Sequence, residues 1–142
     1  RYGVGVGDIQ DVISTALDKT KVLDVSQNND NSKYTLSIWT KHGNTNQRFR
    51  FREVAGGRYQ IISGLGGTVE VPNGSTADCV QIFISQPNNV ENEFWQIVPA
   101  SNAPGAYYIK SFCGKALDVE AAKTADGTRV LQYQHAPCAN QT

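Results

Sequence analysis

The sequence predicts an all-β domain in which one four-stranded unit occurs three times and closes into a barrel. Short alternating apolar runs recur along the 142 residues, as expected for half-buried strands. A motif made of an acidic residue and an asparagine recurs in steps of 46 and 48 residues. A period of about 45 residues indicates a repeated supersecondary unit, and closure of such units removes exposed strand edges.

The repeated motif is polar. Each repeat has an acidic residue within a short apolar run and an asparagine 22 positions later. The acids are Asp24, Glu70 and Asp118, and the asparagines are Asn46, Asn92 and Asn140. The next residues are Gln47, Glu93 and Gln141. A core does not need a repeated acid and amide, so their recurrence indicates a function.

Each repeat is expected to contain four strands, and the repeats span residues 7–52, 53–99 and 100–142. The alternating runs are residues 36–39, 49–51, 59–61, 80–83, 94–97, 107–109 and 130–133. Clusters of Gly, Asn, Pro and Ser separate them, as in turns. Residues 9–17 could form a short amphipathic helix, but we favour a strand because the matching positions of the other repeats read as strands. The alternation also places Phe49 and Trp95 in the core.

Composition excludes several classes of function. Thirteen acidic and thirteen basic residues give a net charge of zero, so nucleic acid and anionic membranes are disfavoured partners. No window of 18 consecutive apolar residues predicts a transmembrane helix. Cys79, Cys113 and Cys138 lack the spacing of metal ligands, and we expect neither a metal nor a cofactor.

The chain resembles the ricin-B-type β-trefoil lectins and carbohydrate-binding modules that carry a Gln-x-Trp signature. The residues that carry the resemblance are 23–25, 46–49, 92–95, 117–119, 125–128, 130–133 and 140–142. The resemblance covers nearly the whole chain. It implies a single β-trefoil domain, a secreted or extracellular location, and up to three shallow sugar pockets, one in each repeat.

The resemblance also implies the residues of each pocket. The first pocket would use Asp24, Trp39, Asn46 and Gln47, with His42 nearby. The third would use Asp118, Tyr133, Asn140 and Gln141, with His135 nearby. In both, the aromatic residue follows the acid by 15 positions. The second would use Glu70, Phe83, Asn92 and Glu93, but Phe83 follows the acid by 13 positions, so we expect a weak or inactive site.

These residue types suit a sugar. The apolar face of a pyranose packs on an aromatic ring, and a carboxylate accepts hydrogen bonds from two adjacent hydroxyls. The asparagine amide both donates and accepts, whereas the glutamine is expected to brace the acid. A few net hydrogen bonds correspond to a dissociation constant of roughly 0.1–1 mM for one site. Two sites on one chain would then act through avidity.

Two structural questions stay open in the sequence. Many members of the family have a disulfide between the acid-bearing strand and the next strand, so a Cys113–Cys138 bridge is an alternative to buried free thiols. The third repeat ends at Thr142, where the family has a tryptophan and a final strand. Either the sequence is part of a longer protein, or residues 1–6 complete the third repeat, with Tyr2 in place of that tryptophan.

The leading functional prediction is non-enzymatic binding of galactose, N-acetylgalactosamine or xylan-type glycans. The alternatives are a trefoil protease inhibitor and a sugar-targeting domain of a larger hydrolase or toxin. Catalysis by this chain is disfavoured, because glycoside hydrolysis needs two carboxylates and each repeat supplies one. A homodimer is compatible with a lectin, but no sequence feature tests it.

Overall fold

The computed structural model describes residues 11–27, 33–88, 90–136 and 138–142. Its strands are β1 (Ser14–Thr15), β2 (Asp18–Gln27), β3 (Tyr34–Thr40), β4 (Phe49–Val54), β5 (Arg58–Ser63), β6 (Thr68–Glu70), β7 (Val80–Gln81), β8 (Phe83–Ser85), β9 (Gln96–Pro99), β10 (Tyr107–Lys110), β11 (Ala116–Val119) and β12 (Val130–Tyr133). Its single-turn 3-10 helices are η1 (Thr45–Gln47), η2 (Pro72–Gly74), η3 (Glu91–Glu93), η4 (Glu120–Ala122) and η5 (Ala139–Gln141). The all-β prediction is confirmed.

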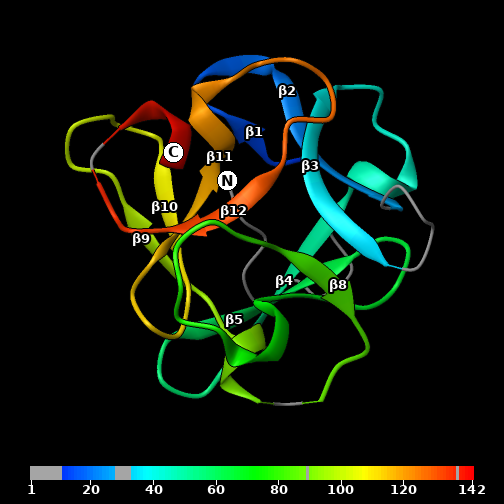
Figure 1. The fold of residues 1–142 in the computed structure, drawn as a ribbon, viewed down its shortest axis with the longest axis vertical. Coiled ribbons are helices and arrows are strands. Elements are labelled where there is room, and N and C mark those ends of the chain that lie inside the picture. Colours follow the sequence, from blue (N-terminus) through cyan, green and yellow to red (C-terminus); the bar gives the residue numbers. More distant parts are fainter. Residues whose placement is uncertain (1–10, 28–32, 89, 137) are drawn as a thin grey trace.

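The elements form three similar groups around a common centre. Figure 1 shows β2 and β3 in one lobe, β5 and β8 in a second, and β9, β10 and β11 in a third. Each group contains a hairpin that carries the acid of the motif: β2–β3, β6–β8 and β11–β12. The hairpins occupy equivalent positions in the three groups, so the three acids also lie in equivalent places.

The first and fourth strands of successive repeats pair side by side. Strand β4 pairs with β5, and β9 pairs with β10. Single bridges connect Asp11 with Phe49 and Tyr59 with Trp95. The described part of residues 9–17 thus contains a strand and a bridge and no helix, as favoured above; residues 9 and 10 lie outside the described residues.

The core lies between the three hairpins and the paired strands. Phe49 and Trp95 are almost completely buried, which confirms their assignment to the core. The Trp95 indole donates to the Val69 carbonyl at 2.9 Å, so its polar group is satisfied inside the molecule. On β2, Leu23 and Val25 face this core, and the strand alternation turns Asp24 to the opposite face. The acid is therefore presented on the outer side of its hairpin.

A cavity of about 250 Å³ lies between β1 and β10, next to the C-terminal turn η5. Among the described residues, repeat three has no counterpart of β4 or β9 beside this cavity. The suggestion that residues 1–6 complete the third repeat lies outside the described residues. No helix in the described ranges is long and apolar enough to cross a membrane.

The three cysteines are free thiols, so the suggested Cys113–Cys138 bridge is wrong. The pairing of β11 with β12 ends at Ala116 and Tyr133, and the cysteines lie in the separate turns beyond that pair. Cys113 Sγ lies 3.5 Å from Gln132 Oε1, whereas Cys138 Sγ lies 3.5 Å from the Ala136 carbonyl oxygen. Cys79 and Cys113 are exposed, so the expectation of buried thiols also fails for these two.

Candidate functional site

The asparagine of each motif lies in a single 3-10 turn that returns the chain to the acid-bearing strand. These turns are η1, η3 and η5, and each ends at the residue that follows the asparagine. In all three, the asparagine Nδ2 donates to the carbonyl of the residue after the acid. The acceptors are Val25 at 3.3 Å, Val71 at 2.9 Å and Val119 at 3.4 Å. The spacing of 22 residues thus reports a direct contact between turn and strand.

In repeat one, two amides hold one carboxylate oxygen. Asn46 Nδ2 and Gln47 Nε2 donate to Asp24 Oδ2 at 3.1 and 3.0 Å. Asp24 is 3% exposed, and its Oδ1 accepts no hydrogen bond from any described residue. This second oxygen is therefore available to accept hydrogen bonds from a ligand.

Gln47 connects the acid to the loop that follows β3. Its Nε2 also donates to the Thr40 carbonyl at 3.0 Å, and its Oε1 accepts from the backbone amides of His42 and Gly43 at 2.8 and 3.1 Å. All of its hydrogen-bonding groups are used inside the protein, and the residue is fully buried. Gln47 therefore braces the site and does not face a ligand, as the sequence predicted.

His42 lies at the edge of the first site. Its Nδ1 accepts the amide hydrogen of Asn44 at 3.0 Å, which leaves Nε2 as the protonated nitrogen of the neutral ring. Nε2 is 4.0 Å from Asp24 Oδ2, and the side chain is 39% exposed. An N–H donor and a carboxylate acceptor thus lie next to each other at the same surface.

Trp39 supplies an exposed aromatic surface on the face of the hairpin that carries Asp24. It pairs with Val22, two residues before the acid, and alternate residues of a strand share a face. Trp39 is 41% exposed, although tryptophan is on average a highly buried residue. The first site therefore combines an acceptor, an N–H donor and an apolar platform.

Repeat three builds the same network with a different distribution of bonds. Asn140 Nδ2 donates to Asp118 Oδ1 at 3.0 Å, and Gln141 Nε2 donates to Asp118 Oδ2 at 2.9 Å. Gln141 also donates to the Gln134 carbonyl at 2.9 Å and accepts from the Ala136 amide at 2.8 Å. Its platform residue, Tyr133, is 40% exposed.

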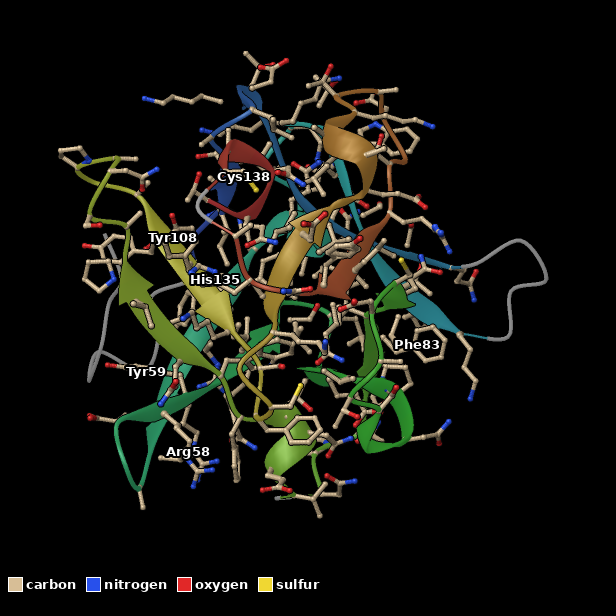
Figure 2. The ribbon with its side chains drawn as sticks, turned by 60° about the vertical axis from the view of Figure 1, so that its left-hand side comes forward. Arg58, Tyr59, Phe83, Tyr108, His135 and Cys138 are labelled. Atoms are coloured by element: carbon tan, nitrogen blue, oxygen red, sulfur yellow. The ribbon has the colours of Figure 1, made fainter. Side chains whose placement is uncertain are left out.

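His135 does not occupy the place that His42 has in the first site. Its ring packs edge-on against Tyr108, with 4.6 Å between the ring centroids (Figure 2). The structure records no hydrogen bond or ion pair between His135 and Asp118, and its buried Nδ1 has no partner. His135 thus packs against Tyr108 and does not pair with the acid of its repeat as His42 does, and its role beside the third pocket stays a prediction.

Burial shifts the acids of both sites in the same direction. Loss of solvent raises the pKa of Asp24 above its ordinary value of 3.8, and hydrogen bonds from Gln47 and Asn46 oppose this effect. Loss of solvent likewise raises the pKa of Asp118, against hydrogen bonds from Gln141 and Asn140. The protein thus holds each carboxylate where its charge is costly, which is common at functional sites.

In repeat two, Glu93 replaces the glutamine that donates to the acid in the other repeats, and its carboxylate accepts hydrogen bonds from residues outside the motif. Glu93 is fully buried and accepts from Gln60 Nε2 at 2.9 Å and Thr68 Oγ1 at 3.1 Å. Both carboxylate oxygens also lie 3.2 Å from the Asn88 amide nitrogen. Arg52 donates to Gln60 Oε1, which turns the Gln60 amide hydrogens toward Glu93. Two carboxylates cannot donate to each other, so Glu93 does not support Glu70.

Glu70 is held loosely by comparison with the other acids. Its hydrogen-bond partner among the described residues is Asn92, whose Nδ2 lies 3.5 Å from Glu70 Oε2, at the limit of a hydrogen bond. Phe83 pairs directly with Glu70, as Ser37 pairs with Asp24. Phe83 is therefore not the counterpart of Trp39, and its place in a weak second site stays a prediction.

The counterpart of the platform in repeat two is Ser85. It pairs with Thr68, two residues before the acid, as Trp39 pairs with Val22 and Tyr133 with Ala116. The hairpins of all three repeats share one register, because each acid pairs with the residue 13 positions later. Repeat two therefore lacks both the amide brace of its acid and an aromatic platform.

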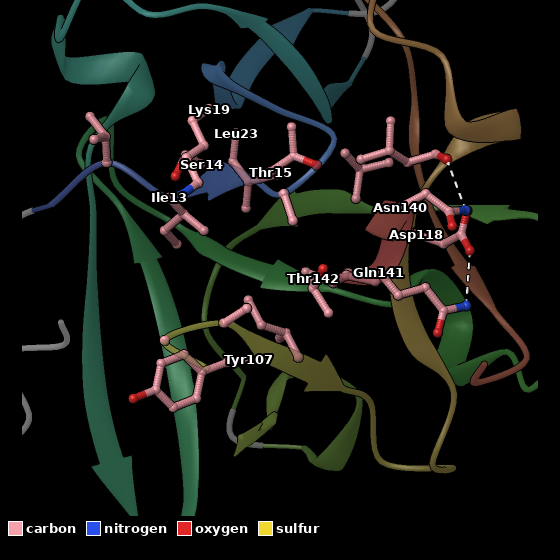
Figure 3. Close-up of a pocket in the computed structure, with 18 of the residues that line it drawn as sticks. Ile13, Ser14, Thr15, Lys19, Leu23, Tyr107, Asp118, Asn140, Gln141 and Thr142 are labelled. Carbon is pink, nitrogen blue, oxygen red and sulfur yellow. Dashed lines mark hydrogen bonds between the residues drawn. The ribbon is translucent and has the colours of Figure 1, made fainter. Parts of the chain in front are cut away.

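The cavity between β1 and β10 borders the third site from another side. Figure 3 shows Asp118, Asn140 and Gln141 at one end, with Ile13 and Tyr107 across the opening. Tyr133 does not line this cavity. We therefore place the candidate sugar surface at Tyr133 and the exposed side of the network. The described residues contain no group of three or more His, Cys, Asp or Glu side chains that could hold a metal ion.

Sequence reasoning missed two sets of residues. Gln60 and Thr68 stabilise Glu93, and the interval of the repeated motif marks neither position. The acidic residues of two loops, Asp78 and Asp126, form ion pairs with Lys115 and Lys21 beside the third and first sites. Their signal is a common distance of eight residues from the acid of their own repeat.

Comparisons with solved structures identify the fold. The designed threefold-symmetric protein ThreeFoil has a TM-score of 0.82 and 28% identity, over 93% of both chains. An exo-β-1,3-galactanase from Clostridium thermocellum has a TM-score of 0.80 and 28% identity, over 93% of this chain and 28% of the enzyme. A ricin B-like lectin from Macrolepiota procera, in complex with lactose, has a TM-score of 0.73 and 23% identity, over 95% and 91%. The β-trefoil prediction is confirmed.

Sequence comparisons identify the family. A search of curated protein sequences found no match. The model of the ricin-type beta-trefoil lectin domain-like family matches residues 63–133, which is half of the chain. That segment contains the hairpin of the third site and the whole hairpin of repeat two. The chain therefore belongs to the ricin-type β-trefoil lectin domain-like family.

Proposed function

We propose that this chain binds glycans through its first and third sites and does not catalyse a reaction on them. Membership of a lectin-like family supports carbohydrate binding in general. The observation that carries the choice of sites is the shared network of acid, asparagine and glutamine beside an exposed aromatic ring. Repeat two lacks this combination, so we assign no sugar to it.

The groups of the first site match the chemistry of a pyranose. The C–H face of the sugar packs on Trp39, and Asp24 Oδ1 accepts hydrogen bonds from adjacent hydroxyls. Nε2 of His42 donates to a hydroxyl oxygen near that carboxylate. We expect the site to be shallow, because Trp39 is 41% exposed, and to bind with a dissociation constant of roughly 0.1–1 mM.

We favour galactose-containing glycans over N-acetylgalactosamine and xylan-type ligands. The support is the 28% identity with the exo-β-1,3-galactanase, which acts on a galactose polymer. This chain spans 28% of that enzyme and 16% of a mosquitocidal holotoxin with a TM-score of 0.80. A targeting domain of a larger protein would use the same sites, so it is the second candidate. A protease inhibitor would leave the two repeated networks without a role.

The test is a glycan array with the intact chain and three variants. The variants are Asp24→Ala, Asp118→Ala and the double substitution. Glu70→Ala is the matched control, because it removes the equivalent acid from the repeat to which we assign no sugar. Circular dichroism and thermal melting check that each variant is folded.

We expect galactose-terminated glycans to bind the wild type and the Glu70→Ala control equally. Each single substitution should remove one site and most of the avidity, and the double variant should not bind. A folded wild type that binds no glycan would refute the proposal. Binding that survives in the folded double variant would assign the sugar to another surface.

A further inference from the structure

The first site is bordered by an aspartate that belongs to repeat three. Asp126 accepts a hydrogen bond from the Thr40 amide at 2.7 Å and from the Thr40 hydroxyl at 2.9 Å. It also forms an ion pair with Lys21 at 2.7 Å. Thr40 is the residue directly after Trp39, so this aspartate fixes the end of the strand that carries the platform.

An aspartate of repeat two lies across the third site in the same way. Asp78 accepts a hydrogen bond from the Gln134 amide at 2.9 Å and forms an ion pair with Lys115 at 2.9 Å. Gln134 is the residue directly after Tyr133. The two arrangements match position by position: each aspartate follows its own acid by eight residues, and each lysine precedes the acid of its site by three.

The neighbouring backbone repeats the match. The amide of Gly127 donates to the Ile38 carbonyl at 2.8 Å, and that of Cys79 donates to the equivalent Gln132 carbonyl at 2.9 Å. Gly127 has a φ of 87° and Cys79 a φ of 65°. Only glycine adopts such angles freely, so repeat two keeps this loop shape in spite of backbone strain at Cys79.

The pair of an aspartate from the neighbouring repeat and a lysine occurs at the two sites that have an aromatic platform. In repeat two, the position of the lysine is Gly67 and that of the platform is Ser85. The position eight residues after Asp24 is Ser32, which lies outside the described residues. The aspartate and lysine thus accompany the aromatic residue and are absent from the sequence positions of the site without one.

We propose that each intact site is completed by its neighbour: Asp126 of repeat three is a positioning residue for Trp39, and Asp78 of repeat two is a positioning residue for Tyr133. This inference rests on the proposed function of the two sites. The aspartates hold the backbone after each ring, so the ring is already oriented when the sugar arrives. Preorganisation of this kind raises affinity without a new contact to the ligand.

The experiment uses lactose and two single-site backgrounds. Asp118→Ala leaves only the first site, and Asp24→Ala leaves only the third. In the first background, Asp126→Ala should weaken lactose binding about tenfold, since a hydrogen bond to a charged group is lost, whereas Asp78→Ala should have no effect. In the Asp24→Ala background, Asp78→Ala should weaken lactose binding about tenfold, whereas Asp126→Ala should have no effect. Asp126→Asn keeps an acceptor for the Thr40 amide and should restore most of the affinity.

A second measurement needs no sugar. Amide hydrogen exchange followed by NMR should become faster at Thr40 in Asp126→Ala and faster at Gln134 in Asp78→Ala, with the other amide unchanged. Equal weakening of both sites by one substitution would show general destabilisation and overturn the proposal. Unchanged exchange at both amides would also overturn it. If the wild type does not bind lactose, the proposed sugar ligand fails, and the exchange rates still decide whether the aspartates position the strand ends.

Discussion

Repeats one and three differ from repeat two by one atom at the position after the asparagine. In all three repeats, an oxygen of that side chain accepts backbone amide hydrogens of the loop before it: His42 in repeat one, Asn88 in repeat two and Ala136 in repeat three. In repeats one and three, the other atom is an amide nitrogen, which reaches the acid. In repeat two it is an oxygen, which cannot donate.

This difference separates a structural role from a functional one. The oxygen that holds the loop is common to the three repeats, so the loop keeps its shape even where the acid has lost its brace. The amide nitrogen braces the acid in the two repeats to which we assign a sugar. Repeat two therefore keeps the loop and lacks the bond between amide and acid.

The largest expected effect comes from replacing Glu93 of repeat two with the glutamine that the other repeats have at that position. Glu93→Gln should lower the free energy of unfolding by about 2–3 kcal/mol, because Gln60 and Thr68 donate to different oxygens of Glu93 and the new amide group would face one of these buried donors in place of an acceptor. Urea denaturation measures the change. The control is Glu91→Gln, the same substitution on an exposed residue of the same turn. A loss below about 0.5 kcal/mol would show that Gln60 and Thr68 do not depend on the carboxylate.

The next effect separates the platforms of the repeats. Trp39→Ala should weaken the first site about tenfold, as expected for an aromatic contact of about 1.5 kcal/mol. Phe83→Ala should leave lactose affinity unchanged and reduce only stability, because Phe83 pairs directly with Glu70 and does not occupy the platform position. Calorimetric titration of both variants decides the matter. An equal loss of binding in the two variants would contradict the register assigned to repeat two.

The motif spacing predicted more of the site than the aromatic residues did. The interval of 22 residues recurs in all repeats, and the structure brings each asparagine to its acid. A constant interval in a repeated unit reports a constant spatial neighbour. Phe83 follows its acid by 13 positions and pairs with it directly, so it does not take the place that Trp39 and Tyr133 have two positions further along their strands. Register decides which face and which row a side chain occupies.

Contacts outside the repeated motif could not be predicted from its spacing. Glu93 depends on Gln60 from β5 of the same repeat, and the first site borders Asp126 from repeat three, far away in sequence. The proposed Cys113–Cys138 bridge, within repeat three, failed because it assumed that two turns beyond a strand pair stay adjacent. Strand pairing and barrel closure bring these segments into place, and the interval between acid and asparagine does not encode that.

A smaller effect distinguishes the two candidate sites from each other. Asp24 receives both amides on one oxygen, so Asp24→Asn can keep both bonds with its remaining carbonyl oxygen. Asp118 receives one amide on each oxygen, so Asp118→Asn would set its amide group against another donor. We expect Asp118→Asn to cost about 1 kcal/mol more than Asp24→Asn in urea denaturation. Equal costs would show that the acids are held alike.

The smallest expected effect is a pH dependence. As the pH falls, the stability relative to a double variant should rise, whereas the affinity for sugar should fall. Burial raises the pKa of Asp24 and Asp118 above 3.8 in the folded protein. In the window between 3.8 and the raised pKa, the folded state binds more protons than the unfolded state, so these two groups destabilise the fold increasingly as the pH rises. Relative to the Asp24→Asn, Asp118→Asn double variant, the wild type should gain stability as the pH falls through this window.

Binding should change in the other direction, because a protonated carboxyl loses an acceptor for sugar hydroxyls. Lactose affinity should therefore begin to fall at a pH above the ordinary aspartate value of 3.8, while the difference in melting temperature between wild type and double variant moves in favour of the wild type. The double variant cancels the contributions of other carboxyls, such as Asp18, whose pKa is lowered by its hydrogen bonds with Thr20. Lactose affinity and the stability relative to the double variant could instead fall together as the pH decreases. In that case the ionised Asp24 and Asp118 would stabilise the fold. The energetic cost of burying them would then not distinguish repeats one and three from repeat two.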